Sequence, residues 1–167
     1  MNSNNLINAN DQLKTLIGLR GLVISRQANL VEINFGSGES GHTLRLRCGF
    51  RIRDSHAIFV ANTDIYNPSS SVLQKSTFNY DSYFWDIQGG NCFDEWVQNQ
   101  SPAFFETLEV VDAKVNSIGD ISIHLSQNIV IEAFIDTVDD ECWRVYKTKG
   151  DNPHFIMDGN GSGYILE

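Results

Sequence analysis

Apolar and polar residues alternate along two stretches of this chain, residues 30–52 and 120–145. A period of two residues places the apolar side chains on one face of a β-strand. The alternating apolar residues are Val31, Ile33, Phe35, Leu44, Leu46 and Cys48 in the first stretch, and Ile121, Ile123, Leu125, Ile129, Ile131 and Ala133 in the second. A glycine-rich loop divides the first stretch and Gln127-Asn128 divides the second, so each stretch predicts a β-hairpin.

Each predicted hairpin is followed by an aromatic-Arg-aliphatic triplet. The triplets are Phe50-Arg51-Ile52 and Trp143-Arg144-Val145, and each precedes a turn and a further apolar run. This repetition predicts an internal duplication in which residues 19–61 and 107–158 form two related halves. The alternative is that two unrelated hairpins of one β-protein share the pattern.

The pattern predicts a mainly β fold with a minor α component. We expect antiparallel sheets from the two halves, forming a sandwich or an open barrel within a single domain, residues 1–167. Two or so short helices are expected, over residues 12–17 after Asn10-Asp11 and over 92–99 after Asn91. Residues 1–12 predict a disordered lead-in, and Ser101-Pro102 is expected to end the second helix.

The composition narrows the classes of partner. The chain has 12 basic and 21 acidic side chains, a net charge of −9, which disfavours binding to nucleic acid and suits a basic protein partner. No apolar run approaches the ~20 residues of a membrane helix, so we expect no membrane association. The N-terminal residues lack the pattern of a signal peptide, and the three cysteines lack zinc spacing, so we expect a reduced, cytoplasmic location in a bacterium.

The sequence assigns no catalytic, metal-binding or cofactor-binding residue. Cys92 at a predicted helix N-terminus is the best thiol candidate, because the positive end of a helix lowers a thiol pKa. The acidic run at residues 136–141 lacks the ligand spacing of a calcium loop, and a solvated loop is the simpler interpretation. Asp151, His154 and Asp158 match no known ligand spacing, so an exposed histidine is the simpler interpretation there.

Six residues are candidates for a pocket or an interface. Arg51 and Arg144 occupy equivalent places, where they pair with carboxylates such as Glu132 or bind an anionic ligand. The aromatic cluster around Gly89-Gly90 packs as a second core or anchors an interface. The candidate residues are Arg51, Arg144, Trp143, His154, Trp85 and Trp96.

Four segments carry a resemblance to a known family. These are IGLRGLVISRQANLVEINF, TLRLRCGFRI, FWDIQGGNCFDEW and ECWRVYKTKGDNPHFIMDGNG. Together they resemble a family of small bacterial proteins of unassigned function, some of which are similar to immunity proteins that neutralise a toxin. The resemblance spans about residues 13–161 and implies a protein partner, but it carries over no catalytic residue.

We therefore expect a binding protein without catalytic activity, in the manner of an immunity protein, rather than an enzyme. The alternative is a small-ligand-binding protein or an enzyme whose pocket lies between the two halves, with Arg51, Arg144 and His154 as its candidates. A monomer and a homodimer joined through strand edges both fit the sequence.

Overall fold

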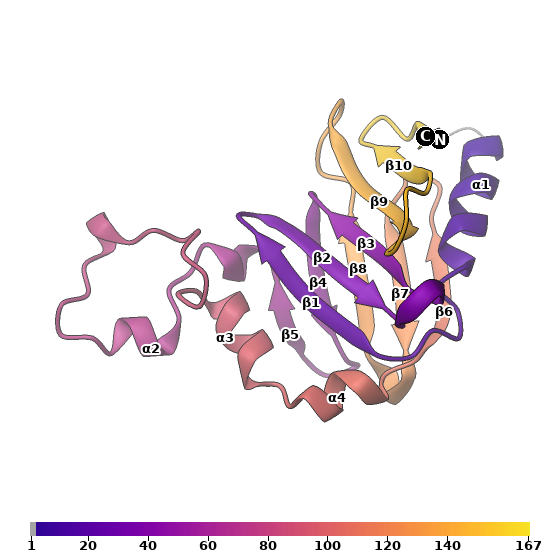
Figure 1. Cartoon of the computed structure of the whole chain (residues 1–167). Coiled ribbons are helices and arrows are strands. Elements are labelled where there is room, and N and C mark those ends of the chain that lie inside the picture. The colour runs from indigo at the N-terminus through magenta and orange to yellow at the C-terminus, as the bar shows by residue number, and fades with distance from the viewer. Residues whose placement is uncertain (1–2) are drawn as a thin grey trace.

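A computed structural model describes residues 3–167 and shows the mainly β fold that the alternation predicts. Its strands are β1 (Leu22–Gln27), β2 (Leu30–Phe35), β3 (His42–Leu46), β4 (Gly49–Arg53), β5 (Ile58–Ala61), β6 (Val110–Val115), β7 (Ile121–Leu125), β8 (Val130–Phe134), β9 (Glu141–Lys147), β10 (His154–Asp158) and β11 (Gly163–Leu166). Within the described residues, they form two antiparallel sheets that do not close into a barrel (Figure 1).

Helical segments lie between and before the strands. The α-helices of the described chain are α1 (Ser3–Lys14), α2 (Ser70–Leu73), α3 (Cys92–Asn99) and α4 (Pro102–Thr107). Single 3₁₀ turns are Gly38–Ser40, Asn62–Ile65, Tyr80–Ser82 and Ser126–Asn128. No helix in residues 3–167 has both the length and the apolar content to cross a membrane.

The two halves are interleaved between the sheets. The six-stranded sheet has the order β1-β2-β3-β9-β10-β11, and the five-stranded sheet has the order β5-β4-β8-β7-β6. Each half therefore gives its first three strands to one sheet and its next two strands to the other. The register also matches, because Arg51 of β4 pairs with Glu132 of β8 as Arg144 of β9 pairs with Arg45 of β3. An internal duplication would produce this arrangement, and it stays a prediction.

The apolar residues of both sheets meet in one core. All twelve alternating residues named from the sequence are at most 4% exposed. Trp143 is fully buried among them, where its indole Nε1 donates a hydrogen bond to the carbonyl oxygen of Gly119 at 2.9 Å. The predicted turn is also present, since Gln127 and Asn128 adopt positive φ angles of 63° and 61°.

Helices cover the two open sides of the sandwich. The helix α1 contacts β6, β10 and β11, whereas α3 contacts β5 and α4 contacts β1. The segments that lead into β1 and β6 pair with each other, since Gly21 N donates to Leu108 O at 2.8 Å and Val110 N donates to Leu19 O at 3.0 Å. Each half is therefore covered by a helix that precedes the other half.

The bounds of the first helix predicted from the sequence, residues 12–17, are wrong, because α1 spans Ser3–Lys14. The helix α1 begins by Ser3 rather than at residue 12, so residues 3–12 are not a disordered lead-in; Met1 and Asn2 lie outside the described residues. Its apolar face, which includes the fully buried Ala9 and Leu13, is stabilised by packing rather than by intrinsic helix propensity. The second predicted helix is confirmed, since α3 spans Cys92–Asn99 and ends before Ser101-Pro102. Ser101 also caps α4, a helix that the sequence did not predict, because its hydroxyl accepts from Phe104 N at 3.1 Å.

The shared core predicts a specific cost for removing Trp143. Trp143→Ala should lower the free energy of unfolding by about 3–5 kcal/mol, because it leaves a cavity between the sheets and an unpaired carbonyl at Gly119. Urea unfolding followed by far-UV circular dichroism measures this change. Val23→Ala, at a position 63% exposed on β1, is the control and should change stability by less than about 0.5 kcal/mol. Equal effects of the two substitutions would contradict a shared core built around Trp143.

Candidate functional site

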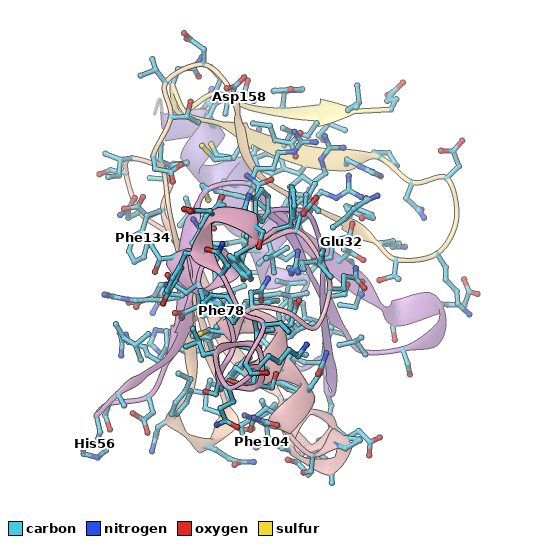
Figure 2. All side chains as sticks on the ribbon, turned by 90° about the vertical axis from the view of Figure 1, so that its left-hand side faces the viewer. Glu32, His56, Phe78, Phe104, Phe134 and Asp158 are labelled. Atoms are coloured by element: carbon cyan, nitrogen blue, oxygen red, sulfur yellow. The ribbon has the colours of Figure 1, made fainter. Side chains whose placement is uncertain are left out.

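The six candidate residues do not converge on one site. Arg51 lies on the outer face of the five-stranded sheet, and Arg144 and His154 lie on the outer face of the six-stranded sheet. Seen along the sandwich, Glu32 and Phe134 mark these two faces on opposite sides of the molecule (Figure 2). Trp143 is in the core, so the structure does not place it on a pocket or an interface.

Arg51 forms an ion pair within its own sheet, and its partner is Glu132, the carboxylate expected from the sequence. Its Nε donates to Glu132 Oε2 at 2.6 Å, and Arg53 Nε donates to the same oxygen at 2.7 Å. The guanidinium of Arg51 also lies 5.1 Å from the ring centroid of Phe134. The hydrogen bond from Arg53, with the further contribution of Arg51, outweighs burial and lowers the pKa of Glu132 to about 2. These contacts give Arg51 a structural role.

Arg144 and His154 belong to a second polar network. Arg144 forms an ion pair with Glu141, and its Nη1 lies 3.1 Å from His154 Nδ1. The His154 ring stacks on Tyr146, with ring centroids 4.0 Å apart and planes 10° apart. Burial, together with the positive charges of Arg144 and Arg45, lowers the pKa of His154 and so favours its neutral form. The network ties neighbouring strands together.

The other chemical candidates gain no support as reactive groups. Burial raises the pKa of Cys92, and Asp64 and Glu95 raise it further, which corrects the expectation of a thiol activated by the helix end. No group of three or more His, Cys, Asp or Glu side chains in residues 3–167 is placed to hold a metal ion.

An aromatic segment projects from one end of the sandwich. Residues 66–90, which we call the arm, extend away from the sheets between β5 and α3 and contain α2 (Figure 1). Five large apolar side chains of the arm are between 40% and 69% exposed. They are Tyr66, Leu73, Tyr80, Phe84 and Ile87. Trp85 is half-buried at the base of the arm, 4.9 Å from the ring of Tyr66.

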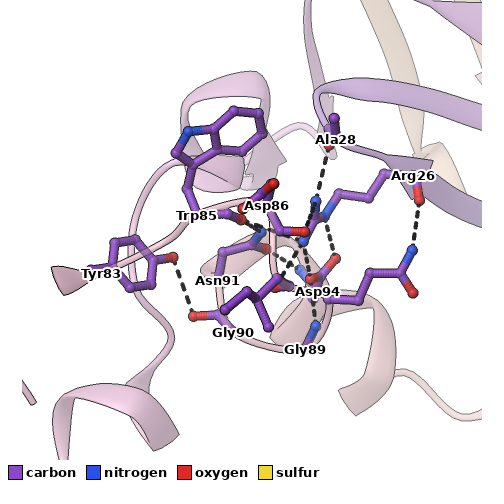
Figure 3. A network of polar contacts seen from close by, with 11 residues as sticks. Arg26, Ala28, Tyr83, Trp85, Asp86, Gly89, Gly90, Asn91 and Asp94 are labelled. Carbon is purple, nitrogen blue, oxygen red and sulfur yellow. Dashed lines mark hydrogen bonds and ion pairs between the residues drawn. The ribbon is translucent and has the colours of Figure 1, made fainter.

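A buried ion pair fixes the arm to the sandwich (Figure 3). Arg26 of β1 donates from Nε to Asp94 Oδ1 at 2.7 Å and from Nη2 to Asp94 Oδ2 at 2.5 Å. The two side chains are only 1% and 9% exposed. We call this pair, which joins β1 to the first turn of α3, the clamp.

The clamp also satisfies backbone groups of the arm. The guanidinium of Arg26 donates to the carbonyl oxygens of Asp86 at 3.4 Å and Ile87 at 3.2 Å, and Asp94 Oδ2 accepts from Gly89 N at 2.7 Å. Asn91 caps α3 and donates to the carbonyl oxygen of Trp85 at 3.0 Å. Buried polar groups need such partners, so the clamp holds residues 85–91 in one conformation.

The two ends of the arm are joined to each other as well. Ser69 N donates to Gly90 O at 3.0 Å, and Cys92 N donates to Asn67 O at 2.9 Å. The carboxylate of Glu95 accepts from the amides of Ser70 and Ser71, at 3.1 and 3.2 Å, at the start of α2. The arm is therefore a closed loop whose base is ordered by hydrogen bonds.

An open acidic groove adjoins the arm. It has a volume of about 770 Å³ and lies between the turn after β1 and the loop before β9. Its lining includes Asp136, Asp140 and Glu141 with one cation, Arg47. Ala28 lines the groove and also accepts a hydrogen bond from Arg26 at 3.0 Å, so the groove and the clamp share the same turn.

The clamp was missed by sequence reasoning, although one signal for it exists. In the alternation of β1, Leu22 and Ile24 face inward, and Arg26 occupies the next inward position. A charged residue at a core-facing position requires a buried partner. The partner, Asp94, is 68 positions away in the first turn of α3, so no local pattern identifies it.

The Glu132 ion pairs predict a pH dependence of stability. Because the folded-state pKa is about 2 and the usual value is 4.5, the stabilisation is present above pH 4.5 and is lost as the pH falls toward 2. Glu132→Gln should therefore lose less stability than the wild type between pH 5 and 2, as measured by urea unfolding. Glu39→Gln, at an exposed position, is the control and should follow the wild-type curve. Parallel curves for Glu132→Gln and wild type would rule out this contribution.

The clamp predicts a large cost for removing one charge. Asp94→Asn should lower the free energy of unfolding by about 3–5 kcal/mol, because it leaves the buried guanidinium of Arg26 uncompensated. Hydrogen exchange should also show faster exchange at the amides of residues 85–90. Asp11→Asn, which breaks the exposed pair with Lys14, should change stability by less than about 1 kcal/mol. Unchanged exchange in the arm would show that the clamp does not order it.

Comparisons with known proteins assign neither a family nor a function to the chain. A scan against models of protein families, a search of curated proteins and a search of solved structures find no match for the chain. The resemblance to small bacterial proteins stays a prediction.

Proposed function

We propose that this chain is a protein-binding protein without catalytic activity, and that the arm is its main binding element. The single observation that carries the proposal is an arm that exposes large apolar side chains while its base is fixed by a buried ion pair. Monomeric proteins rarely expose contiguous apolar surface unless it contacts a partner. Aromatic side chains are also the commonest anchors of protein interfaces.

The fixed conformation of the arm supports the interpretation that its exposed apolar side chains bind a partner. Ordering a flexible loop costs free energy at the moment of binding. Here the clamp and the hydrogen bonds between the ends of the arm order it during folding, so that this free energy is not required at the moment of binding. A pre-organised loop can present Tyr80 and Phe84, which are 69% and 66% exposed, without a large rearrangement.

The charge of the chain favours a basic partner. The net charge is −9, and the acidic groove adds carboxylates beside the turn at Ala28 that contacts the clamp. Complementary charge accelerates association and selects against acidic partners. An inhibitor of a basic bacterial toxin, in the manner of an immunity protein, combines these features with the resemblance found in the sequence.

The experiment tests whether binding depends on the arm. Affinity capture with the purified wild type, from lysate or from a panel of purified basic toxins, should recover a basic protein that Tyr80→Ser/Phe84→Ser does not recover. Isothermal titration calorimetry with that protein should show a loss of about 2 kcal/mol or more for the double variant, as expected for interface anchors. Association should also slow as salt concentration rises.

A matched control separates the arm from general surface hydrophobicity. Val111→Ser/Ile118→Ser changes two apolar side chains that are 54% and 59% exposed outside the arm and outside the acidic groove. This control should bind like the wild type. Capture that is lost equally in both double variants, or that never depends on the arm, would refute the proposal.

A further inference from the structure

We infer that a hollow within the arm receives one aromatic side chain with a polar edge, Trp or Tyr, from the protein that the arm binds. The inference rests on the proposed function, because it names what the arm recognises. The hollow has a volume of about 350 Å³ and opens to solvent. That volume is large enough to receive one aromatic side chain.

The walls of the hollow are suited to a ring. Its apolar lining comes from Val72, Phe78, Tyr83, Phe84 and Ile87. The rings of Phe78 and Tyr83 already meet edge to face, with centroids 6.2 Å apart. Aromatic rings prefer such edge-to-face contacts, so an incoming ring can extend the same arrangement. In the view along the arm, Phe78 lies at the front of the molecule (Figure 2).

The polar groups of the hollow select the kind of ring. Gln88 uses its amide nitrogen to donate to Arg26 O at 3.0 Å, which leaves its Oε1 as an acceptor on the exposed lining of the hollow. The exposed Thr77 adds a hydroxyl to the same lining. Either oxygen can accept from the N–H of an indole or the O–H of a phenol. An entirely apolar side chain that covers these exposed oxygens would displace their water without replacing its hydrogen bonds.

One cation excludes basic side chains from the hollow. Lys75 is the charged residue of the lining, and its ammonium group forms no ion pair with residues 3–167. The exposed ammonium group of Lys75 would repel a second positive charge that enters the hollow, whereas the face of an aromatic ring attracts a cation. The basic residues of the partner are therefore expected at the acidic groove, and the aromatic residue at the hollow.

The hollow is preformed by the clamp. Gly89 and Gly90 line it, and Gly89 N donates to Asp94 Oδ2 at 2.7 Å. Gly90 O accepts from the Tyr83 hydroxyl at 3.3 Å. The same ion pair that fixes the arm therefore fixes one wall of the hollow, which reduces the ordering required when a side chain enters.

The test uses capped amino acids as side-chain probes. In a ¹⁵N-labelled sample, N-acetyl-tryptophanamide should shift the backbone amides of the hollow-lining residues in a saturable manner, with a dissociation constant on the order of 1–10 mM. N-acetyl-argininamide should bind at least about tenfold more weakly, because of Lys75. Ser82→Trp, which fills the hollow from its exposed rim, should abolish the shifts, and Ser37→Trp on a distant exposed loop should not. Thr77→Trp serves as a second filling variant if Ser82→Trp does not fold.

Three results would overturn the inference. They are an absence of shifts in the arm at about 10 mM probe, equal binding of the two probes, and shifts that survive both filling variants. Light scattering adds a fourth, since a wild-type dimer that becomes a monomer on filling would assign the hollow to a second copy of this chain.

The outcome is separable from that of the proposed function. Of the two residues in the capture variant, Phe84 lines the hollow and Tyr80 does not, so the single substitution Tyr80→Ser separates the two tests. The Tyr80 ring packs on Phe78 of the lining, with centroids 4.7 Å apart, so the tryptophan probe is also titrated into Tyr80→Ser to show that its hollow is unchanged. Capture that depends on Tyr80 without any binding of the tryptophan probe would leave the proposed function in place and remove this inference. Binding of the tryptophan probe, without any partner whose capture depends on the arm, would refute the proposed function and leave a hollow that binds aromatic rings.

Discussion

Both sheets depend on a single interior that neither half of the chain can complete alone. Each half sends three strands into one sheet and two into the other, so every side of the core contains residues from both halves. Burial of apolar surface drives folding in proportion to the area removed from water. The need to bury both sheet faces together therefore determines where the crossovers, the covering helices and the loops must lie.

The arm is the part of the chain that this interior does not require. It lies in the long connection between β5 and β6, where the first half ends and the second has not begun. The arm carries one lysine and two aspartates, so its net charge of −1 is small within a chain of −9. Its base is held by the ion pair of the clamp and by the hydrogen bonds between its two ends. Such a pair costs desolvation energy, and its value lies in fixing one geometry rather than in stability alone.

The sequence predicted the parts of the fold that local periodicity determines. The alternation around Ile33 and Ile123 identified the strands, Asn91 identified the start of α3, and Glu132 was identified as a partner of Arg51. These features depend on neighbours in sequence or on adjacent strands. The equivalence of Arg51 and Arg144 also appears in the register of the sheets, although the two side chains lie on opposite faces.

The remaining features depend on contacts that no local pattern contains. The pair of Arg26 and Asp94 joins positions 68 residues apart, and α1 is helical because its apolar face packs on strands from the far half of the chain. Trp143 resembled a binding residue because large aromatic residues serve both interfaces and cores. Whether such a residue lies in an interface or in the core depends on how the neighbouring strands pack around it. The identity of the residue does not contain that information.

The reciprocal placement of the helices has a consequence for the integrity of the chain. The helix before β1 covers strands of the second half, and the helix before β6 packs on β1. The hydrogen bonds between residues 18–21 and 108–110 join the halves again at that point. A backbone break within the arm would therefore leave two fragments that stay associated through their core. The molecule is built so that its most exposed segment is also the place where cleavage would do least harm to the rest.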